Sequence, residues 1–181
     1  SAESSGQPSP PASLADSRSF AVAPWVKGET VTLEPMSRIR RLTAEHMVYS
    51  QQTSVHVTTV FHADFTKVAA TRARSKQRFQ AKHGTKLTFM PFIFRAITRA
   101  LAGHPQFNAA VDGTAIVFKQ DINLGIAVAT ENGLIGPVIH GADKKSLVEL
   151  TLAANDLAER ARTKRLKPDG VARGTFTITN P

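Results

Sequence analysis

The sequence predicts an α/β domain in which a mixed sheet is covered by helices. Apolar residues recur every three to four positions in several segments and alternate with polar residues in others, which indicates both helices and strands. The two kinds of element do not alternate strictly along the chain, and this order favours a layered domain. A length of 181 residues suits one such domain with an extension.

The extension is predicted at the N-terminus. Residues 1–24 are rich in Ser, Ala and Pro and are too polar to build a core, so they are interpreted as a linker. A remnant of cloning or a frayed terminus is the alternative interpretation. Residues 25–181 form the predicted domain.

The first part of the domain is predicted to contain two helices separated by a strand. Ser37 can cap a helix over residues 37–50, whose apolar residues return at helical spacing. Residues 55–62 alternate as a strand does. The second helix starts at Asp64 or Thr66 and ends near residue 82.

A strongly apolar third helix is predicted over residues 92–101. Thr88 and Pro91 open it, because proline suits the first turn of a helix. Gly103 and Pro105 close it.

Three strands follow in the prediction, over residues 115–119, 122–130 and 134–139. Residues 131–133, Glu-Asn-Gly, are a strong turn signal between the second and third of these strands. Pro137 favours an edge strand or a bulge, because proline cannot donate to a ladder.

The last two elements are a helix and a strand. Ser146 and Glu149 predict a capping box for a helix that runs to about residue 164. Residues 174–179 then alternate as a strand with three threonines on one face. The Thr179 hydroxyl, at the strand end beside an Asn-Pro turn, is placed to donate a hydrogen bond into a cleft. An ordinary strand with a polar outer face is the alternative.

The composition excludes several functions. The chain has no cysteine, so disulfides, thiolate metal sites and a cysteine nucleophile are excluded. The histidines are dispersed, and no metal site is predicted. No segment is long and apolar enough to span a membrane, and a cytoplasmic location is expected. A net charge of +9 favours anionic partners, but the few aromatic residues argue against a nucleic-acid platform.

Five segments have a specific sequence as a set: MSRIRRLTAEHM (36–47), VHVTTVFHADFT (55–66), HPQFNAAVDG (104–113), INLGIAVATENGLIGPVIHGADKKSL (122–147) and GTFTITNP (174–181). Together they resemble the catalytic domain of the dihydrolipoamide acyltransferases of 2-oxoacid dehydrogenase complexes. The resemblance extends over about residues 29–181 and implies a chloramphenicol-acetyltransferase-like fold.

The resemblance implies acyl transfer between a dihydrolipoyl thiol and coenzyme A. It implies that the lipoyl group is carried on a separate domain, and that residues 1–24 resemble the linkers that join mobile modules to the core. It also implies a homotrimer that assembles into a larger core, with lipoyl domains, a decarboxylase and dihydrolipoamide dehydrogenase as partners.

The resemblance also implies roles for four residues. Thr179 matches the hydroxyl that stabilises the oxyanion of the intermediate. Arg72 matches an arginine that contacts the 3′-phosphate of coenzyme A, and a solvated arginine is the alternative. His56 and Asn108 match residues near the substrate channel and the active centre. The alternatives are a packed or surface histidine and a turn-forming asparagine.

The general base of the family does not transfer to any residue here. The family uses a histidine in a DHR-x-x-DG motif, and none of the six histidines has an Asp-Gly at the required offset. We therefore expect a domain that is incomplete at the C-terminus and inactive alone. A non-catalytic scaffold for assembly and partner docking is the alternative function, and a nucleic-acid binder, suggested by charge only, is the third.

Overall fold

The computed structural model describes residues 30, 32, 34–130 and 133–180. The chain divides into two units, residues 1–60 and 61–181, which are described separately. The predicted turn at Glu131 and Asn132, and the predicted linker, lie outside the described residues.

The described part of the first unit consists of helix α1, Arg38–Thr53, and an extended segment. The Ser37 hydroxyl caps the helix by accepting a hydrogen bond from the Arg40 N–H at 3.3 Å. This confirms the predicted cap. An N-cap hydroxyl satisfies one of the backbone donors that the first turn leaves free.

The predicted strand over residues 55–62 is wrong. Residues 54–65 have no regular secondary structure, and the side chains of Val55 and Val57 are 94% and 84% exposed. The alternation of apolar and polar residues is real, but a strand also needs a neighbour that satisfies its backbone groups. Within the described residues, no strand pairs with this segment.

The second unit contains three helices and seven short strands among its described residues, together with three short 3₁₀ turns. The helices are α2 (Thr66–His83), α3 (Met90–Gly103) and α4 (Leu147–Arg162). The strands are β1 (Ala109–Asp112), β2 (Ala115–Phe118), β3 (Leu124–Ile126), β4 (Val128–Thr130), β5 (Gly133–Ile135), β6 (Val138–Ile139) and β7 (Phe176–Ile178).

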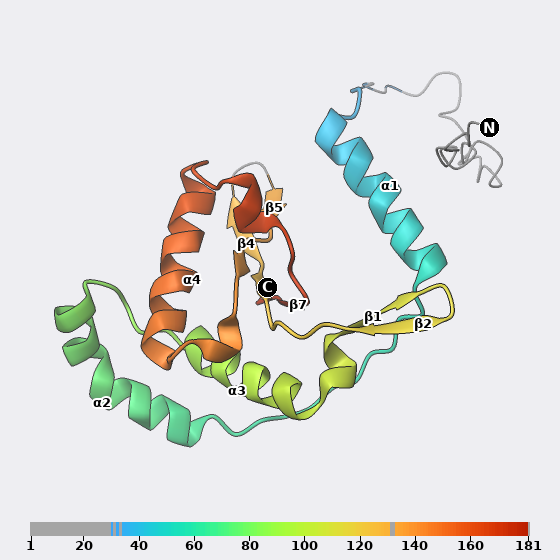
Figure 1. The fold of residues 1–181 in the computed structure, drawn as a ribbon. Helices are drawn as coiled ribbons and strands as arrows, with labels where there is room; N and C mark the ends of the chain where they lie inside the picture. The colour runs from blue at the N-terminus through green and yellow to red at the C-terminus, as the bar shows by residue number, and fades with distance from the viewer. Residues whose placement is uncertain (1–29, 31, 33, 131–132, 181) are drawn as a thin grey trace, which may run out of the picture. The chain divides into compact units, whose positions relative to one another are not determined.

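A three-stranded mixed sheet lies at the centre of this unit, in the order β6-β3-β7. Leu124 of β3 pairs with Ile139 of β6 in an antiparallel register and with Phe176 of β7 in a parallel register. The sheet therefore joins segments that lie far apart in the sequence (Figure 1). The predicted α/β class with a mixed sheet is confirmed.

Two hairpins, β1 with β2 and β4 with β5, complete the strands. The strand boundaries around β4 and β5 differ from the predicted ones. The single strand expected over residues 122–130 is divided between β3 and β4, because β4 turns away to pair with β5. The segment 134–139 is divided in the same way at Pro137, whose carbonyl accepts a hydrogen bond from the Ile126 N–H at 2.9 Å. The hairpin of β1 and β2 turns at Gly113, which has a φ of 56°.

The core of the second unit forms where α3 and α4 meet the strands. Helix α4 packs against α3, β4 and β6 (Figure 1). The largest buried apolar side chains include Phe94 of α3, Leu124 of β3, Ile139 of β6 and Leu150 of α4. Since the three short strands of the central sheet offer little area by themselves, this helical cover supplies most of the apolar burial that holds them.

The capping box of α4 is confirmed. The Ser146 hydroxyl accepts from the Glu149 N–H at 3.2 Å, and the Glu149 carboxylate accepts from the Ser146 N–H at 2.7 Å. Two otherwise free donors are thereby satisfied at once.

No helix in the described part of the chain combines the length and the apolar composition that a membrane crossing requires.

Candidate functional site

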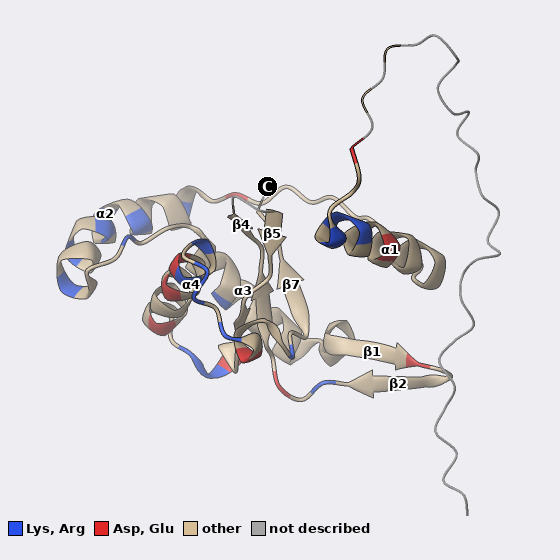
Figure 2. Cartoon of the chain, turned by 90° about the horizontal axis from the view of Figure 1, so that it is seen from above, with Lys and Arg blue, Asp and Glu red and all other residues tan. Residues whose placement is uncertain are grey.

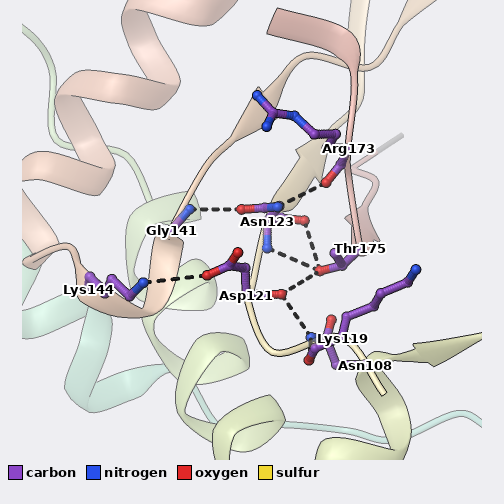
Figure 3. Close-up of polar contacts among 8 residues, drawn as sticks. All are labelled: Asn108, Lys119, Asp121, Asn123, Gly141, Lys144, Arg173 and Thr175. Atoms are coloured by element: carbon purple, nitrogen blue, oxygen red, sulfur yellow. Dashed lines mark hydrogen bonds and ion pairs between the residues drawn. The ribbon is translucent and has the colours of Figure 1, made fainter. Parts of the chain in front are cut away.

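Asn123 fixes the start of β7 to the rest of the sheet. Its side-chain oxygen accepts from the Gly141 N–H at 2.9 Å, and its amide donates to the Arg173 carbonyl at 3.0 Å. Its own N–H donates to the Thr175 hydroxyl at 3.1 Å (Figure 3). One side chain thus joins the segment before β3, the segment after β6 and the approach to β7.

Asn108 extends these hydrogen bonds to the loop between β2 and β3. Its amide donates to the carbonyls of Lys119 and Asp121 at 2.9 and 3.0 Å (Figure 3). The side chain is 2% exposed, and its oxygen has no hydrogen-bond partner among the described residues. In this structure the amide of Asn108 therefore shapes the loop that leads from β2 to β3.

Thr179 follows directly after β7, which ends one residue earlier than predicted. The residue is exposed, and within the described part of the chain no hydrogen bond engages its hydroxyl. Its two neighbours, Ile178 and Asn180, both line a cleft of about 300 Å³. Thr179 itself does not line this cleft, so its exposed hydroxyl lies at the end of β7 next to cleft-lining residues and not inside the cleft.

The cleft lies between the strands and the two long core helices. Its lining mixes apolar side chains, such as Phe94 and Ile126, with the amides of Asn155 and Asn180. The Asn155 amide donates to the Thr85 hydroxyl at 2.8 Å, which fixes the loop between α2 and α3 to α4. A lining of this kind fits a narrow chain that carries both methylene and amide groups.

Arg72 lies on α2 and faces the same loop. Its Nε–H donates to the Leu87 carbonyl at 2.9 Å, and its guanidinium stacks 4.6 Å from the centre of the Phe89 ring. Thr88, between these two residues, lines the cleft, as do Ile178 and Asn180. The second unit therefore connects Arg72 to the cleft margin through the loop of residues 85–89.

The four predicted site residues do not form one cluster. Arg72 contacts the loop of residues 85–89, Thr179 follows β7, and Asn108 belongs to the buried network beside the loop after β2. His56 is exposed in the extended segment of the first unit. Its role, like those of the other three, stays a prediction.

Two asparagines were not predicted: Asn123, which holds the approach to β7, and Asn155, which lines the cleft and holds the loop between α2 and α3. Asn123 could have been noticed as a polar residue directly before the buried apolar run of β3. Asn155 carries no such signal, because it follows the regular pattern of a helix.

Asp64 forms hydrogen bonds at the start of α2. Its carboxylate accepts from the Thr66 hydroxyl at 2.5 Å and from the Thr66 N–H at 2.8 Å. These two hydrogen bonds hold the pKa of the Asp64 carboxyl below its ordinary value, and the bond from the hydroxyl has the larger effect. The Asp64 carboxylate thus holds Thr66, the first residue of α2, while Phe65 occupies the N-cap position.

No group of three His, Asp or Glu side chains in the described residues lies close enough together to hold a metal ion.

The sequence matches relatives over most of the predicted domain. It is 41% identical over 151 residues to the dihydrolipoyllysine-residue acetyltransferase component of the pyruvate dehydrogenase complex of Corynebacterium glutamicum, covering 82% of this chain and 22% of that protein. It is 40% identical over 152 residues to the succinyltransferase component of the 2-oxoglutarate dehydrogenase complex of Rickettsia bellii, covering 84% of this chain and 38% of that protein.

The fold matches solved structures as well. The dihydrolipoamide acetyltransferase of Azotobacter vinelandii, solved to investigate a serine, a histidine and an asparagine in its catalytic mechanism, aligns with a TM-score of 0.79 and 34% identity. That alignment covers 96% of this chain and 67% of the solved chain. A probable dihydrolipoamide acetyltransferase from Listeria monocytogenes aligns with the same TM-score and 31% identity, covering 86% of this chain and 65% of the solved one.

The fold and these matches therefore define an acyltransferase-type catalytic domain. Residues 28–181 match the family described as 2-oxoacid dehydrogenases acyltransferase (catalytic domain), and the chain belongs to this family. It spans between about a fifth and two fifths of the length of the relatives named above.

Proposed function

We propose that this chain supplies one wall of the active site of a dihydrolipoyl acyltransferase. The reaction moves an acyl group between a dihydrolipoyl thiol and the thiol of coenzyme A. Family membership over residues 28–181 supports the class of reaction. The observation that carries the proposal is the exposed hydroxyl of Thr179, which directly follows β7 in the segment GTFTITN.

The proposed role of Thr179 is to stabilise the tetrahedral intermediate. When one thiol attacks the thioester carbonyl, the carbonyl oxygen becomes an oxyanion, and a fixed donor lowers the energy of that state more than the energy of the substrate. The Thr179 hydroxyl is a donor of this kind. The contacts of Asn123 with Arg173 and Thr175 fix the strand that presents it.

A base must also take the proton of the attacking thiol. None of the six histidines of this sequence lies in a DHR-x-x-DG motif, so we assign the base to no residue of this sequence. In this proposal a partner surface carries the base and closes the other side of the cleft.

The proposed substrates are coenzyme A and a lipoyl group on a separate domain. The proposed assembly is a homotrimer within a larger core that also binds a decarboxylase and dihydrolipoamide dehydrogenase. The likeness to the cubic core of a pyruvate dehydrogenase multienzyme complex, at 34% identity and a TM-score of 0.79, supports a core of this type.

Substitution of Thr179 tests the proposal. In the native complex that contains this chain, we expect Thr179→Ala to lower kcat about a hundredfold, with KM for coenzyme A nearly unchanged, because the donor acts on the transition state. Thr179→Ser keeps one O–H and is the matched control, with kcat expected within a few fold of the unsubstituted chain. Steady-state kinetics of acyl-CoA formation measure both.

An unchanged kcat in Thr179→Ala would remove the proposed oxyanion role. If instead the complex forms no acyl-CoA even with the unsubstituted chain, the scaffold function, in which the domain serves assembly and docking, replaces the proposed transferase function.

A further inference from the structure

The positive charge of this protein comes from one acid-free stretch. Between Asp64 and Asp112 the sequence contains nine of its 23 Lys and Arg residues and none of its 14 Asp and Glu residues. The rest of the chain carries equal numbers of both signs, so this stretch accounts for the whole net charge of +9. Figure 2 shows Lys and Arg along α2, with no Asp or Glu.

Four of these cations form a line along α2, which we call the basic stripe. It consists of Lys67, Arg74, Arg78 and Lys82, all exposed. Their spacings of seven, four and four residues are close to whole turns of an α-helix, so the four side chains share one face. From Lys67 to Lys82 the stripe extends for about 22 Å at 1.5 Å per residue.

Another side of α2 contacts the protein. The half-buried residues of the helix, among them Val68, Arg72 and Phe79, lie roughly 120° around the helix from the basic stripe. Arg72 belongs to this inner face through its bond to the Leu87 carbonyl, and Phe79 lies at its border with the stripe. The stripe itself is exposed, so its charge is not explained by the attachment of α2 to its own unit.

The described acids of this chain do not neutralise the stripe. Three of them pair with other cations: Asp121 with Lys144, Asp156 with Arg160 and Asp169 with Arg173. Two others bind the starts of helices, Asp64 at α2 and Glu149 at α4. The ion pairs among the described residues thus leave the stripe unengaged, and we place the complementary charge on a different protein.

We propose that the basic stripe of α2 docks an acidic α-helical segment of a partner protein. A partner helix that carries Glu or Asp once per turn presents carboxylates at the same spacing as Arg74, Arg78 and Lys82. The exposed Ala70 and Ala81 beside the stripe leave room for the main chain of the partner.

A groove beside the stripe adds an apolar contact. It has a volume of about 330 Å³ and is lined by Arg74, Ser75, Arg78, Phe79, Lys82 and His83. Phe79 offers an apolar floor between cations, which suits a helix with one acidic and one apolar edge. A nucleic-acid duplex presents its phosphates along a curved path, so a straight stripe meets only a few of them. The stripe also lacks an exposed aromatic ring for base stacking.

A matched pair of variants tests the docking site. The stripe variant carries Lys67→Gln, Arg74→Gln, Arg78→Gln and Lys82→Gln. The control variant carries Lys76→Gln, Lys119→Gln, Lys164→Gln and Lys167→Gln, which removes four exposed charges elsewhere. Gln has nearly the helix propensity of Lys and Arg, and circular dichroism checks that both variants are folded.

The probe is a labelled 20-residue Ala/Gln helix with four Glu residues at spacings of four, four and seven. Fluorescence anisotropy at low ionic strength measures its binding to the full chain. We expect the stripe variant to weaken binding roughly tenfold and the control variant to weaken it less than twofold. A peptide of the same composition, with its Glu residues distributed around the helix, is expected to bind more weakly.

Charge inversion provides a second measurement. We expect the double variant Arg74→Glu, Arg78→Glu to lose its affinity for the Glu peptide and to bind a peptide that carries Lys at the same positions. Equal losses in the stripe and control variants would overturn the proposal, since binding would then follow net charge alone. Equal binding of the two Glu peptides, or stripe-dependent binding of a 20-base-pair duplex that is tighter than that of the peptide, would also overturn it. None of these measurements depends on acyl transfer.

Discussion

At the scale of single residues, Arg72 has one bond to its own protein and further donors to offer. Its Nε–H is held by the Leu87 carbonyl, and the Phe89 ring covers one face of the guanidinium. Within the described residues, no hydrogen bond occupies its two terminal nitrogens. An arginine fixed in this way loses little entropy when it binds a phosphate.

We expect Arg72→Gln to weaken the binding of coenzyme A by about 10- to 100-fold, the effect of losing hydrogen bonds to a charged group. Dephospho-coenzyme A lacks the 3′-phosphate, so its affinity should stay the same if the predicted contact is correct. Isothermal titration calorimetry measures both ligands, with Lys76→Gln as a control on the same helix. Equal losses for the two ligands would show that Arg72 acts by supporting the loop at Leu87.

The residues that form the buried networks are harder to predict than those that carry chemistry. The Thr179 motif was recognisable because it lies in a specific segment, GTFTITN. Asn108 and Asn123 act through carbonyls and N–H groups that are many residues away, and a backbone group has no signature in the sequence. Only the fold shows which amide meets which carbonyl.

At the scale of elements, the starts of α4 and α1 lie where the sequence predicts them, because the residues that cap each start are close together in the sequence. Ser146 and Glu149 are three residues apart and need no distant partner. Hydrogen bonds with the Ser146 N–H, which has the larger effect, and with the Ser146 hydroxyl hold the pKa of the Glu149 carboxyl below its ordinary value. Since the folded pKa is lowered, the charged carboxylate stabilises the fold above the unfolded pKa, and this contribution is lost as the pH falls through the folded value.

We expect Ser146→Ala to lower the free energy of unfolding by about 1 kcal/mol, the usual effect of losing an N-cap. Glu149→Gln should destabilise the protein at pH 7, and this effect should begin to shrink near pH 4, where the carboxyl of the unfolded chain takes up a proton, and disappear only below the lowered folded pKa. Urea unfolding at several pH values measures both. A Glu149→Gln effect that is the same at pH 7 and pH 3 would exclude the charge as its cause.

The strands were predicted less well than the helices because pairing decides where they end. The alternation over residues 122–130 continues through Ala127, yet β3 and β4 pair with different neighbours on either side of it. The alternation over residues 55–62 has no described partner. A strand boundary depends on segments that can lie anywhere in the chain, whereas a helix closes its own hydrogen bonds.

At the scale of the whole molecule, the class of the fold could be predicted and the distribution of stability could not. The α/β class and the family followed from local patterns and motifs. The core is restricted to the second unit, where α3 and α4 cover the strands. By contrast, no residue of α1 is buried. Composition alone did not distinguish these regions.

Hydrogen exchange should show this difference. We expect the amides of β3 and α4 to exchange slowly and those of residues 54–63 to exchange rapidly, because the latter lie in an exposed segment outside helices and strands. Mass spectrometry of peptides from the exchanged protein measures both regions. Strong protection of residues 54–63 in the isolated chain would contradict the structure of this segment.

The parallel pairing of β3 with β7 has a consequence for synthesis. Thr175, which accepts the Asn123 N–H just before β7, follows that residue by 52 positions along the chain. A ribosome must therefore deliver α4 and the loop after it before the middle strand of the sheet can gain its second neighbour. Pairings this remote form slowly, and until then one edge of a buried apolar strand is open to wrong associations. A nascent chain that stalls in this interval is the form most in need of a chaperone.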